Sequence, residues 1–241
     1  MTSYATLSKT GGRKVNEDAV GVRQKGGSIF CVLADGLGGH NAGEVASALV
    51  VETSLRIFDE GNIPFDELLA TCMNESQNAI IEEQHRTNRI DEMKTTAVML
   101  IIENNKAQWA HVGDSRLYRF ENNAVAERTL DHSVPQMLVL QGEIKEEDIR
   151  HHEDRNRLIR AMGMEWDTQK FILSKPLDLP ASSSFLLSSD GFWELIEDEE
   201  MIDCAANCKN PEKWLTKMEK IILKNGDKSK MDNYSAIGVF V

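Results

Sequence analysis

The chain has 241 residues, of which 39 are acidic and 27 basic, so its formal net charge is −12. This charge disfavours binding to nucleic acids, which depends on lysine and arginine side chains that neutralise phosphates. Anionic membrane surfaces are disfavoured for the same reason. The apolar fraction of 41% is ample for a packed core at this length, and no long run of like charge indicates disorder.

The cysteines and the first residues indicate a cytoplasmic protein. Cys31, Cys72, Cys204 and Cys208 form neither a C-x-x-C pair nor a zinc-knuckle spacing, and the last two are four residues apart on a predicted helix. Residues 1–14 hold no apolar signal core, and no apolar run is long enough to span a bilayer. We therefore expect reduced thiols in a cytoplasmic protein.

Short apolar runs alternate with helical patterns along the chain. Runs bounded by turn residues predict strands over 29–34, 96–102, 108–112, 116–120, 184–188 and 234–241. Apolar residues spaced by three and four positions predict helices around 45–58, 65–73 and 214–222. Gly61-Asn62-Ile63-Pro64 predicts the connection between the first two helices. Because no repeat, linker or low-complexity stretch interrupts the chain, we expect one domain over 1–241.

Two predicted turns favour antiparallel strands. Asn104-Asn105 predicts a hairpin between the second and third strands, and Gly113-Asp114-Ser115 leads directly from the third strand into the fourth. Consecutive strands joined by tight turns pair antiparallel. The helices come in pairs rather than one after each strand. We therefore expect an α+β architecture in which antiparallel sheets carry helices on their outer faces.

Carboxylates stand at the ends of several predicted strands. Asp35, Asp114 and Asp190 each follow an apolar strand, and Asp232 lies just before the last one. Each could be an ordinary turn residue. Buried together, however, they would need a cation, and all-oxygen sites favour magnesium, manganese or calcium over zinc or copper. Gly36, beside Asp35, would let the backbone approach such an ion and offers its carbonyl. The pattern indicates a hard-metal site.

Five motifs occur in an order that resembles a known family. They are Arg13-Lys14-Val15-Asn16-Glu17-Asp18, Ala34-Asp35-Gly36-Leu37-Gly38-Gly39-His40, Val112-Gly113-Asp114-Ser115-Arg116, Ser189-Asp190-Gly191 and Asp232-Asn233. Supporting matches are 95–97, 131–133 and 156–163. Together they resemble the metal-dependent protein serine/threonine phosphatases (the PPM or type-2C family), particularly the compact bacterial members. The resemblance extends over nearly the whole chain, from about residue 13 to 241.

The resemblance implies a fold and a set of metal ligands. The fold would be a central sandwich of two antiparallel sheets flanked by pairs of helices, in four layers. Asp35 would bridge two metal ions, and the carbonyl of Gly36 would bind one of them. Asp190 and Asp232 would complete the protein ligands of the other ion.

Further site residues are implied by the same resemblance. Asp18 would act largely through metal-bound water, with Glu17 as a weaker candidate. Asp114, together with Asp190, would hold a third ion. Arg13 would grip the substrate phosphate, because its planar guanidinium can make two parallel charge-assisted hydrogen bonds.

The implied reaction is hydrolysis of phosphoserine and phosphothreonine in proteins by direct attack of a metal-bridging water, with two or three Mn²⁺ or Mg²⁺ ions. No cysteine is followed six residues later by arginine, so a thiol-based mechanism lacks its nucleophile site. The implied partners are phosphorylated proteins, including a cognate serine/threonine kinase or its targets. We expect a monomer that acts in signalling and binds neither nucleic acid nor membrane.

One departure from the family limits the implied mechanism. Many eukaryotic relatives carry a histidine after the bridging Asp-Gly, where it can protonate the leaving alcohol, whereas this chain has Leu37. His40 is expected to pack or cap near the following helix.

Asp131-His132-Ser133 cannot form a nucleophilic triad, since three consecutive side chains do not converge. We expect it to anchor a polar flap at about 134–155, in which His151 and His152 face solvent.

Two other readings remain open at this stage. A catalytically idle domain that binds phosphoproteins would lack metal ligands, and none of the main ones is missing here. A phosphatase restricted to one regulatory partner would carry the same motifs as a broadly acting one. The sequence therefore favours an active enzyme and does not name its substrate.

Overall fold

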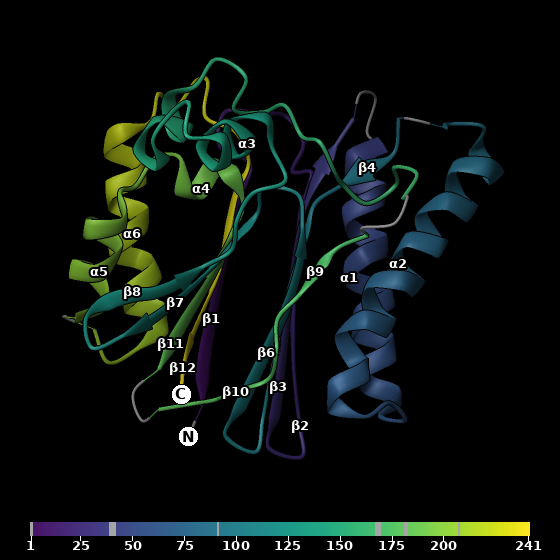
Figure 1. The fold of residues 1–241 in the computed structure, drawn as a ribbon, viewed down its shortest axis with the longest axis horizontal. Coiled ribbons are helices and arrows are strands. Elements are labelled where there is room, and N and C mark those ends of the chain that lie inside the picture. The colour runs from purple at the N-terminus through teal and green to yellow at the C-terminus, as the bar shows by residue number, and fades with distance from the viewer. Residues whose placement is uncertain (1, 39–41, 91, 167–169, 181–182, 207) are drawn as a thin grey trace.

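The computed structural model describes residues 2–38, 42–90, 92–166, 170–180, 183–206 and 208–241. Within these residues, two antiparallel sheets pack face to face and carry helices on their outer faces (Figure 1). One sheet has five strands in the order β1-β12-β11-β7-β8. The other has seven, with the path β10-β6-β5-β3-β2 and with β4 beside β3 and β9 beside β6. The predicted α+β sandwich is confirmed.

The strands of the five-stranded sheet are β1 (Ser3–Lys9), β7 (Arg116–Glu121), β8 (Ala124–Arg128), β11 (Ser184–Ser188) and β12 (Tyr234–Phe240). Those of the seven-stranded sheet are β2 (Asp18–Lys25), β3 (Ser28–Leu37), β4 (Lys94–Thr95), β5 (Ala97–Glu103), β6 (Lys106–Val112), β9 (Ile172–Leu173) and β10 (Leu177–Asp178). The helices are α1 (Ala42–Glu60), α2 (Phe65–Thr87), α3 (Val134–Gln141), α4 (Asp190–Trp193), α5 (Asp198–Ala206), α6 (Pro211–Asn225) and a 3₁₀ turn, η1 (Glu146–His151).

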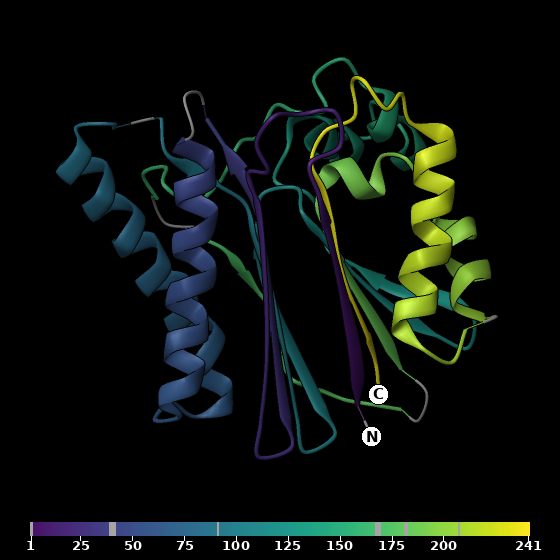
Figure 2. The same ribbon diagram turned by 180° about the vertical axis from the view of Figure 1, so that it is seen from behind.

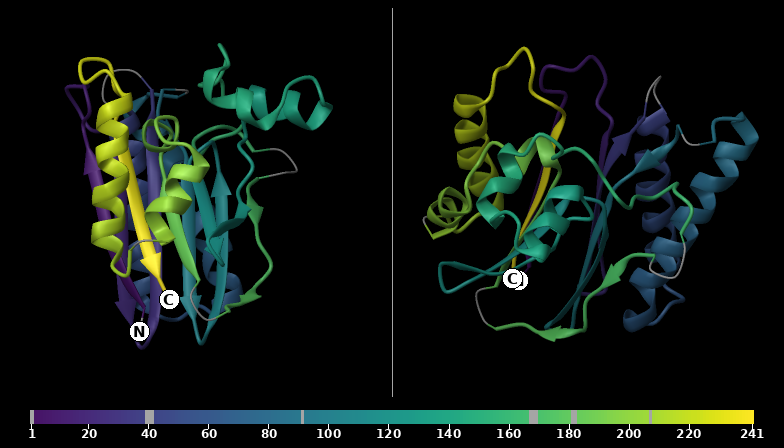
Figure 3. Two further views of the ribbon diagram at one scale, coloured as in Figure 1. Left: turned by 90° about the vertical axis from the view of Figure 1, so that its left-hand side faces the viewer. Right: turned by 45° about the horizontal axis from the view of Figure 1, so that its top comes forward.

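The helices form two outer layers, which Figure 2 shows from behind. α1 and α2 cover the seven-stranded sheet, and α5 and α6 cover the five-stranded one. No described helix is long and apolar enough to span a membrane. α3 and α4 lie together at one end of the sandwich, which Figure 3 brings forward in its right-hand view.

Successive side chains of β3 point to opposite faces of the sheet and so contribute to two apolar cores. Cys31 and Leu33 point into the core between the sheets, whereas Phe30 and Val32 point toward α1 and α2. The ring of Phe30 stacks on that of Phe58 in α1, with centroids 5.4 Å apart. Because both faces of β3 are buried, its sequence is a continuous apolar run rather than an alternating one. Each such fully buried side chain stabilises the fold by about 1.5–3 kcal/mol.

One of the two predicted turns behaves as expected and the other does not. Asn104 and Asn105 both have positive φ, 49° and 61°, and connect the antiparallel pair β5 and β6. The prediction that Gly113-Asp114-Ser115 joins two paired strands is wrong, because β6 and β7 belong to different sheets. Those residues carry the chain across the sandwich. A sharp change of direction does not by itself determine which sheet receives the next strand.

The prediction that Cys208 lies on a helix with Cys204 is also wrong, since α5 ends at Ala206.

Candidate metal centre

The strand-end carboxylates come together at the end of the sandwich where α3 and α4 lie. The register of β2 and β3 sets Asp18 directly opposite Asp35. Asp190 is the first residue of α4, two residues after the end of β11, and Asp232 lies two residues before β12. Since β11 and β12 are neighbours, their carboxylates face the β2–β3 pair across the sandwich.

Asp35 is held by two threonines. Its backbone N–H donates to Thr96 Oγ1 at 2.9 Å, and its carbonyl accepts from Thr95 Oγ1 at 2.8 Å. Burial raises the pKa of the Asp35 carboxyl well above its usual range, and the charges of Asp18, Asp190 and Asp114 raise it further. A hydrogen bond with Asp190 acts in the same direction. Like charges placed opposite each other on paired strands are destabilising.

The other carboxylates share this environment. Ser189 Oγ donates to Asp18 Oδ2 at 2.8 Å, whereas Asp18 Oδ1 is buried and has no hydrogen-bond partner among the described residues. Burial raises the pKa of Asp18 to about 7, against the hydrogen bonds from Ser235 and Ser189. Burial, followed by the charge of Asp190, also raises the pKa of Asp114.

This cluster fits divalent cations. Mutually repelling carboxylates and an orphaned buried oxygen are what a bound ion would neutralise. As the side chains are placed, no three His, Cys, Asp or Glu residues within the described ranges form a ready-made metal cage. Magnesium-like ions do not need one, because they bind through one or two carboxylates and keep several waters.

Arg13 lies beside this cluster in a loop fixed by the start of β12. Its Nη2 donates to Asp232 Oδ2 at 2.7 Å, and its side chain remains 59% exposed. Asn233 Nδ2 donates to the carbonyls of Thr10 and Val15, both at 2.9 Å, and its Oδ1 accepts from the N–H of Glu17 at 2.8 Å. The guanidinium is therefore positioned at the edge of the carboxylates and free to reach a ligand in solvent.

Three of the predicted residues share a cavity with others that sequence reasoning missed. A cavity of about 230 Å³ is lined by Arg13, Asp190 and Asp232, together with Arg155 and Glu194. Arg155 Nε pairs with a Glu194 carboxylate oxygen at 3.2 Å. Burial raises the pKa of Glu194 to about 7, with the charge of Asp190 acting in the same direction. The position of Arg155 directly before the supporting motif at 156–163 was the signal that could have found it.

Asp18, Asp35 and Asp114 do not line this cavity. Each interacts electrostatically with Asp190, which does line it. His40 lies outside the described residues, which omit 39–41. Leu37 is the last residue of β3 and offers no exchangeable proton.

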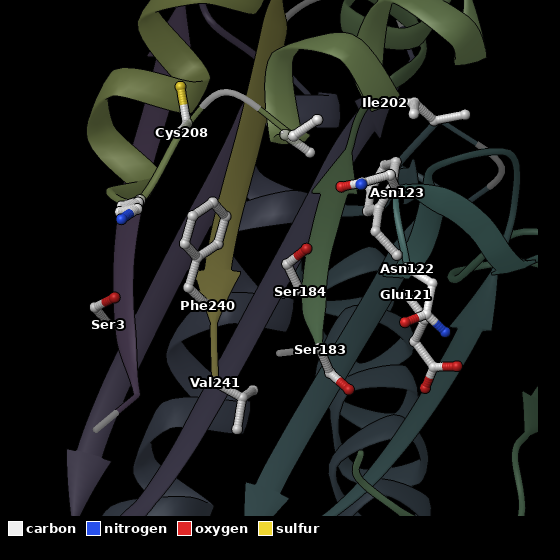
Figure 4. A pocket seen from close by; sticks show the side chains of 14 residues that line it. Ser3, Glu121, Asn122, Asn123, Ser183, Ser184, Ile202, Cys208, Phe240 and Val241 are labelled. Atoms are coloured by element: carbon white, nitrogen blue, oxygen red, sulfur yellow. The ribbon is translucent and has the colours of Figure 1, made fainter. Parts of the chain in front are cut away.

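A larger cavity lies at the opposite end of the five-stranded sheet. Its volume is about 500 Å³, and its lining includes Phe240, Ser184, Asn123 and Cys208 (Figure 4). None of the predicted site residues lines it. Because chemistry rather than volume identifies a functional site, the smaller cavity, which Arg13, Asp190 and Asp232 line, is the candidate site.

The Asp131-His132-Ser133 motif anchors α3, as predicted. Arg116 donates to both carboxylate oxygens of Asp131, at 2.9 and 2.7 Å. The Arg116 guanidinium lies 3.4 Å from the ring centroid of Trp193, whose Nε1 donates to the Asp114 carbonyl at 3.0 Å. Ser133 accepts from the N–H of Gln136 as the N-cap of α3. The motif therefore supports the loop of Asp114 and supplies no nucleophile.

His132 predicts a loss of stability in acid. Its Nδ1 accepts from the N–H of Gly113 at 3.1 Å, and its ring stacks on that of His111. Burial lowers the pKa of His132 to about 3 and also lowers the pKa of His111. Because an unfolded histidine titrates near 6.5, the unfolded state binds more protons than the folded state between about pH 3 and 6.5. The two histidines therefore reduce stability progressively as pH falls below about 6.5.

His132→Asn tests this expectation, because its amide oxygen can accept from Gly113 without titrating. The free energy of unfolding of the wild type should fall more steeply from pH 6.5 toward 4 than that of the variant. The difference in slope should reach about 1.4 kcal/mol per pH unit. Urea unfolding at a series of pH values measures both slopes. Equal slopes would rule out His132 as a source of the acid sensitivity.

Comparisons with known proteins agree with this fold. The family model Protein phosphatase 2C matches residues 8–232. Serine/threonine phosphatase stp of Listeria welshimeri is 32% identical over 197 residues, which cover 79% of this chain and 77% of that protein. Serine/threonine protein phosphatase PstP of Mycobacterium tuberculosis is 31% identical over 83% of this chain and 38% of its own length.

Solved structures lead to the same group. The M. tuberculosis phosphatase PstP/Ppp has a TM-score of 0.87 at 27% identity, with 100% of this chain and 98% of that chain covered. The catalytic domain of PstP in complex with two manganese ions has a TM-score of 0.82 at 27% identity, covering 99% and 97%. The chain therefore belongs to the protein phosphatase 2C family. It is a metal-dependent serine/threonine protein phosphatase that acts on phosphoproteins.

Proposed function

We propose that this chain hydrolyses protein phosphoserine and phosphothreonine at the carboxylate cluster described above, with two or three Mn²⁺ or Mg²⁺ ions. The proposed metal-site residues are Asp35, Gly36, Asp190, Asp232, Asp18 and Asp114. The observation that carries this assignment is the placement of Asp18 opposite Asp35, with Asp190 hydrogen-bonded to Asp35. Such an arrangement of buried carboxylates is costly without cations.

The bound ions would supply a nucleophilic water and neutralise the phosphate charge. The chain's own residues orient the reactants. Asp35 and Asp190 lie within hydrogen-bonding distance of each other, and Arg13 presents its planar fork to a phosphate in the cavity. Because the Leu37 side chain has no proton to donate, another group must protonate the leaving alcohol.

We also propose that residues 1–241 form one catalytic domain with a flap at 134–155, and that it works as a monomer in the cytoplasm. Four cysteines without a disulfide support a reducing compartment. Its substrates would be the phosphorylated proteins of a cognate serine/threonine kinase, or that kinase itself, which gives the enzyme a role in signalling. Capture of phosphoprotein without turnover at saturating manganese would favour an idle binding domain instead.

Arg13→Ala should lower kcat/KM for p-nitrophenyl phosphate by about tenfold to a hundredfold. The variant loses charge-assisted hydrogen bonds worth about 1.5–3 kcal/mol, and each 1.4 kcal/mol corresponds to a factor of ten. Arg13→Lys should recover part of the loss, since it restores the charge without the fork. Steady-state kinetics with saturating manganese measure both variants. Unchanged kcat/KM in Arg13→Ala would remove Arg13 from the site.

A further inference from the structure

Lysines are concentrated in one short stretch of this acidic chain. Residues 209–230 hold seven of its 27 basic residues but only three of its 39 acidic ones. Most of the stretch is α6, which buries Trp214, Met218 and Ile222 in the core beneath the five-stranded sheet. Four exposed lysines follow one another along the outer side of α6 at spacings of four, three and four residues, so they form one row. This lysine row consists of Lys213, Lys217, Lys220 and Lys224.

The lysine row does not stabilise the helix that carries it. Residues three or four positions apart on a helix are neighbours, and like charges at that spacing are destabilising. Elsewhere on the surface that spacing joins opposite charges, as in the pair of Arg56 with Glu60 in α1. No acidic side chain within the described ranges forms an ion pair with Lys213, Lys220 or Lys224. The row is therefore available to a partner outside the helix.

The two acidic residues of α6 do not neutralise the row. Glu212 lies in the first turn, where the positive end of the helix dipole favours an acid. Glu219 accepts from the hydroxyl of Tyr234 at 3.3 Å, so it is directed toward β12. Neither acid is three or four positions from a lysine of the row, which is the spacing that a helical ion pair requires.

α6 ends at the rim of the cavity that contains Arg13. Gly226, which directly follows α6, and Lys230 both line this cavity. Asn225, the last residue of α6, donates from Nδ2 to the carbonyl of Leu195 at 3.0 Å, and Leu195 lines the same cavity. In Figures 1 and 2, α6 runs along the outside of the sandwich and ends at the end that carries α4. The lysine row therefore leads away from the rim of the cavity along one side of the molecule.

The turn after α6 is fixed against the loop of Arg13. The N–H groups of Lys230 and Met231 donate to the carbonyl of Asp227 at 2.8 and 2.9 Å. The N–H of Gly12 donates to the carbonyl of Met231 at 2.9 Å. The surface between the lysine row and Arg13 is therefore already formed before a ligand binds, which reduces the entropy cost of binding.

We propose that the lysine row docks acidic side chains of the substrate polypeptide, so that the enzyme prefers phosphosites with a stretch of aspartate or glutamate on one side. This inference rests on the proposed function, because a phosphate held in the cavity brings the polypeptide to its rim. By the rise of an α-helix, the row from Lys213 to Lys224 is about 16 Å long, which equals about five residues of extended chain. The preferred acidic stretch should therefore be about five residues long.

An extended polypeptide fits the lysine row better than a membrane or a nucleic acid does. Outside residues 209–230, acidic residues exceed basic ones even more than in the whole chain. A large anionic surface would meet this negative charge together with the row. A single extended chain can follow the row alone.

Peptides with phosphothreonine and five glutamates on its N-terminal or C-terminal side test the docking, with glutamines in place of the glutamates as the neutral reference. At saturating manganese and low ionic strength, glutamates on one of the two sides should raise kcat/KM about tenfold, as expected for a few exposed ion pairs. The gain should come from a lower KM rather than a higher kcat, because the row lies away from the reacting atoms. Added salt should reduce the gain, since it screens exposed charges.

The triple variant Lys213→Gln/Lys220→Gln/Lys224→Gln should lose most of this gain. It should keep its turnover of p-nitrophenyl phosphate, which has no polypeptide to reach the row. Its melting temperature should equal or slightly exceed that of the wild type, because the substitutions relieve the repulsion between lysines in α6.

The matched control is Lys106→Gln/Lys170→Gln/Lys175→Gln, which removes the same charge from another part of the surface. All three lysines are exposed, and they lie at the start of β6 and on either side of β9. This variant should keep the gain from the glutamates. An equal loss of the gain in the two triple variants would show that net charge, rather than the lysine row, attracts the peptide, and would overturn the proposal.

The docking and the function on which it rests can fail separately. Failure of the wild type to hydrolyse p-nitrophenyl phosphate with manganese would contradict the proposed function. Fluorescence anisotropy of a labelled glutamate peptide needs no turnover, and it should still show tighter binding to the wild type than to the α6 variant. Equal kcat/KM and equal binding for glutamate and glutamine peptides would overturn the docking. Binding to vesicles of phosphatidylcholine and phosphatidylglycerol without any peptide preference would overturn it in favour of a membrane.

Discussion

Asp35→Asn should abolish manganese-dependent hydrolysis of p-nitrophenyl phosphate and, at the same time, make the metal-free protein more stable. The amide keeps the shape of the carboxylate and can donate to Asp190, but it cannot bridge cations. Loss of metal-ion catalysis removes several kcal/mol of transition-state stabilisation, which corresponds to roughly a thousandfold or more in turnover. Relief of the repulsion from Asp18, Asp190 and Asp114 should raise the melting temperature by about 2–4 °C per kcal/mol gained.

Two melting curves distinguish this expectation from simple damage to the fold. Manganese should raise the melting temperature of the wild type, because it binds the folded state, and should raise that of Asp35→Asn much less. Asp178→Asn, at an exposed carboxylate in β10, is the matched control and should behave as the wild type. Retained turnover in Asp35→Asn, or an equal response of its melting temperature to manganese, would contradict the assignment of Asp35.

Arg116→Ala should destabilise the protein by about 3–5 kcal/mol, because it leaves the charge of Asp131 buried without its partner. Both side chains are only 2% exposed, and the guanidinium also stacks on Trp193. The double variant Arg116→Met/Asp131→Val should recover most of this loss, since it removes both charges and replaces them with apolar side chains of similar total volume. Urea unfolding of the two single variants and the double variant measures the effect. A double variant as unstable as Arg116→Ala would show that the charge pair is not the source of the loss.

The fold was predictable where burial is complete. β3 and β5 are enclosed on both faces, so their apolar runs identify them without an alignment. β1 and β8 escaped prediction because they are edge strands with mostly exposed or half-exposed residues, and they lack an apolar run. The transfer of the chain between sheets at Gly113 depends on packing, which the local sequence does not encode.

The candidate site, like the fold, was predictable from the sequence only in part. Strand-end positions indicated Asp35, Asp114, Asp190 and Asp232, because several carboxylates buried together are costly without a cation. Their separate roles came from the resemblance to the type-2C phosphatases. The pairing of Arg155 with Glu194 joins residues 39 positions apart, and nothing in a single sequence connects them. The placement of Asp18 opposite Asp35 required the strand register.

The ion pair of Arg13 with Asp232 joins residues 219 positions apart, and Ser3 pairs with Phe240 in the same sheet. Contacts between such distant positions form late and slowly, because the chain must first close a very large loop. During translation, Arg13, Asp18 and Asp35 are synthesised early, long before Asp232 and β12. With the proposed ligand Asp232 still missing, a partly synthesised chain has an incomplete site, so phosphatase activity would indicate that the polypeptide has been made and folded as far as β12.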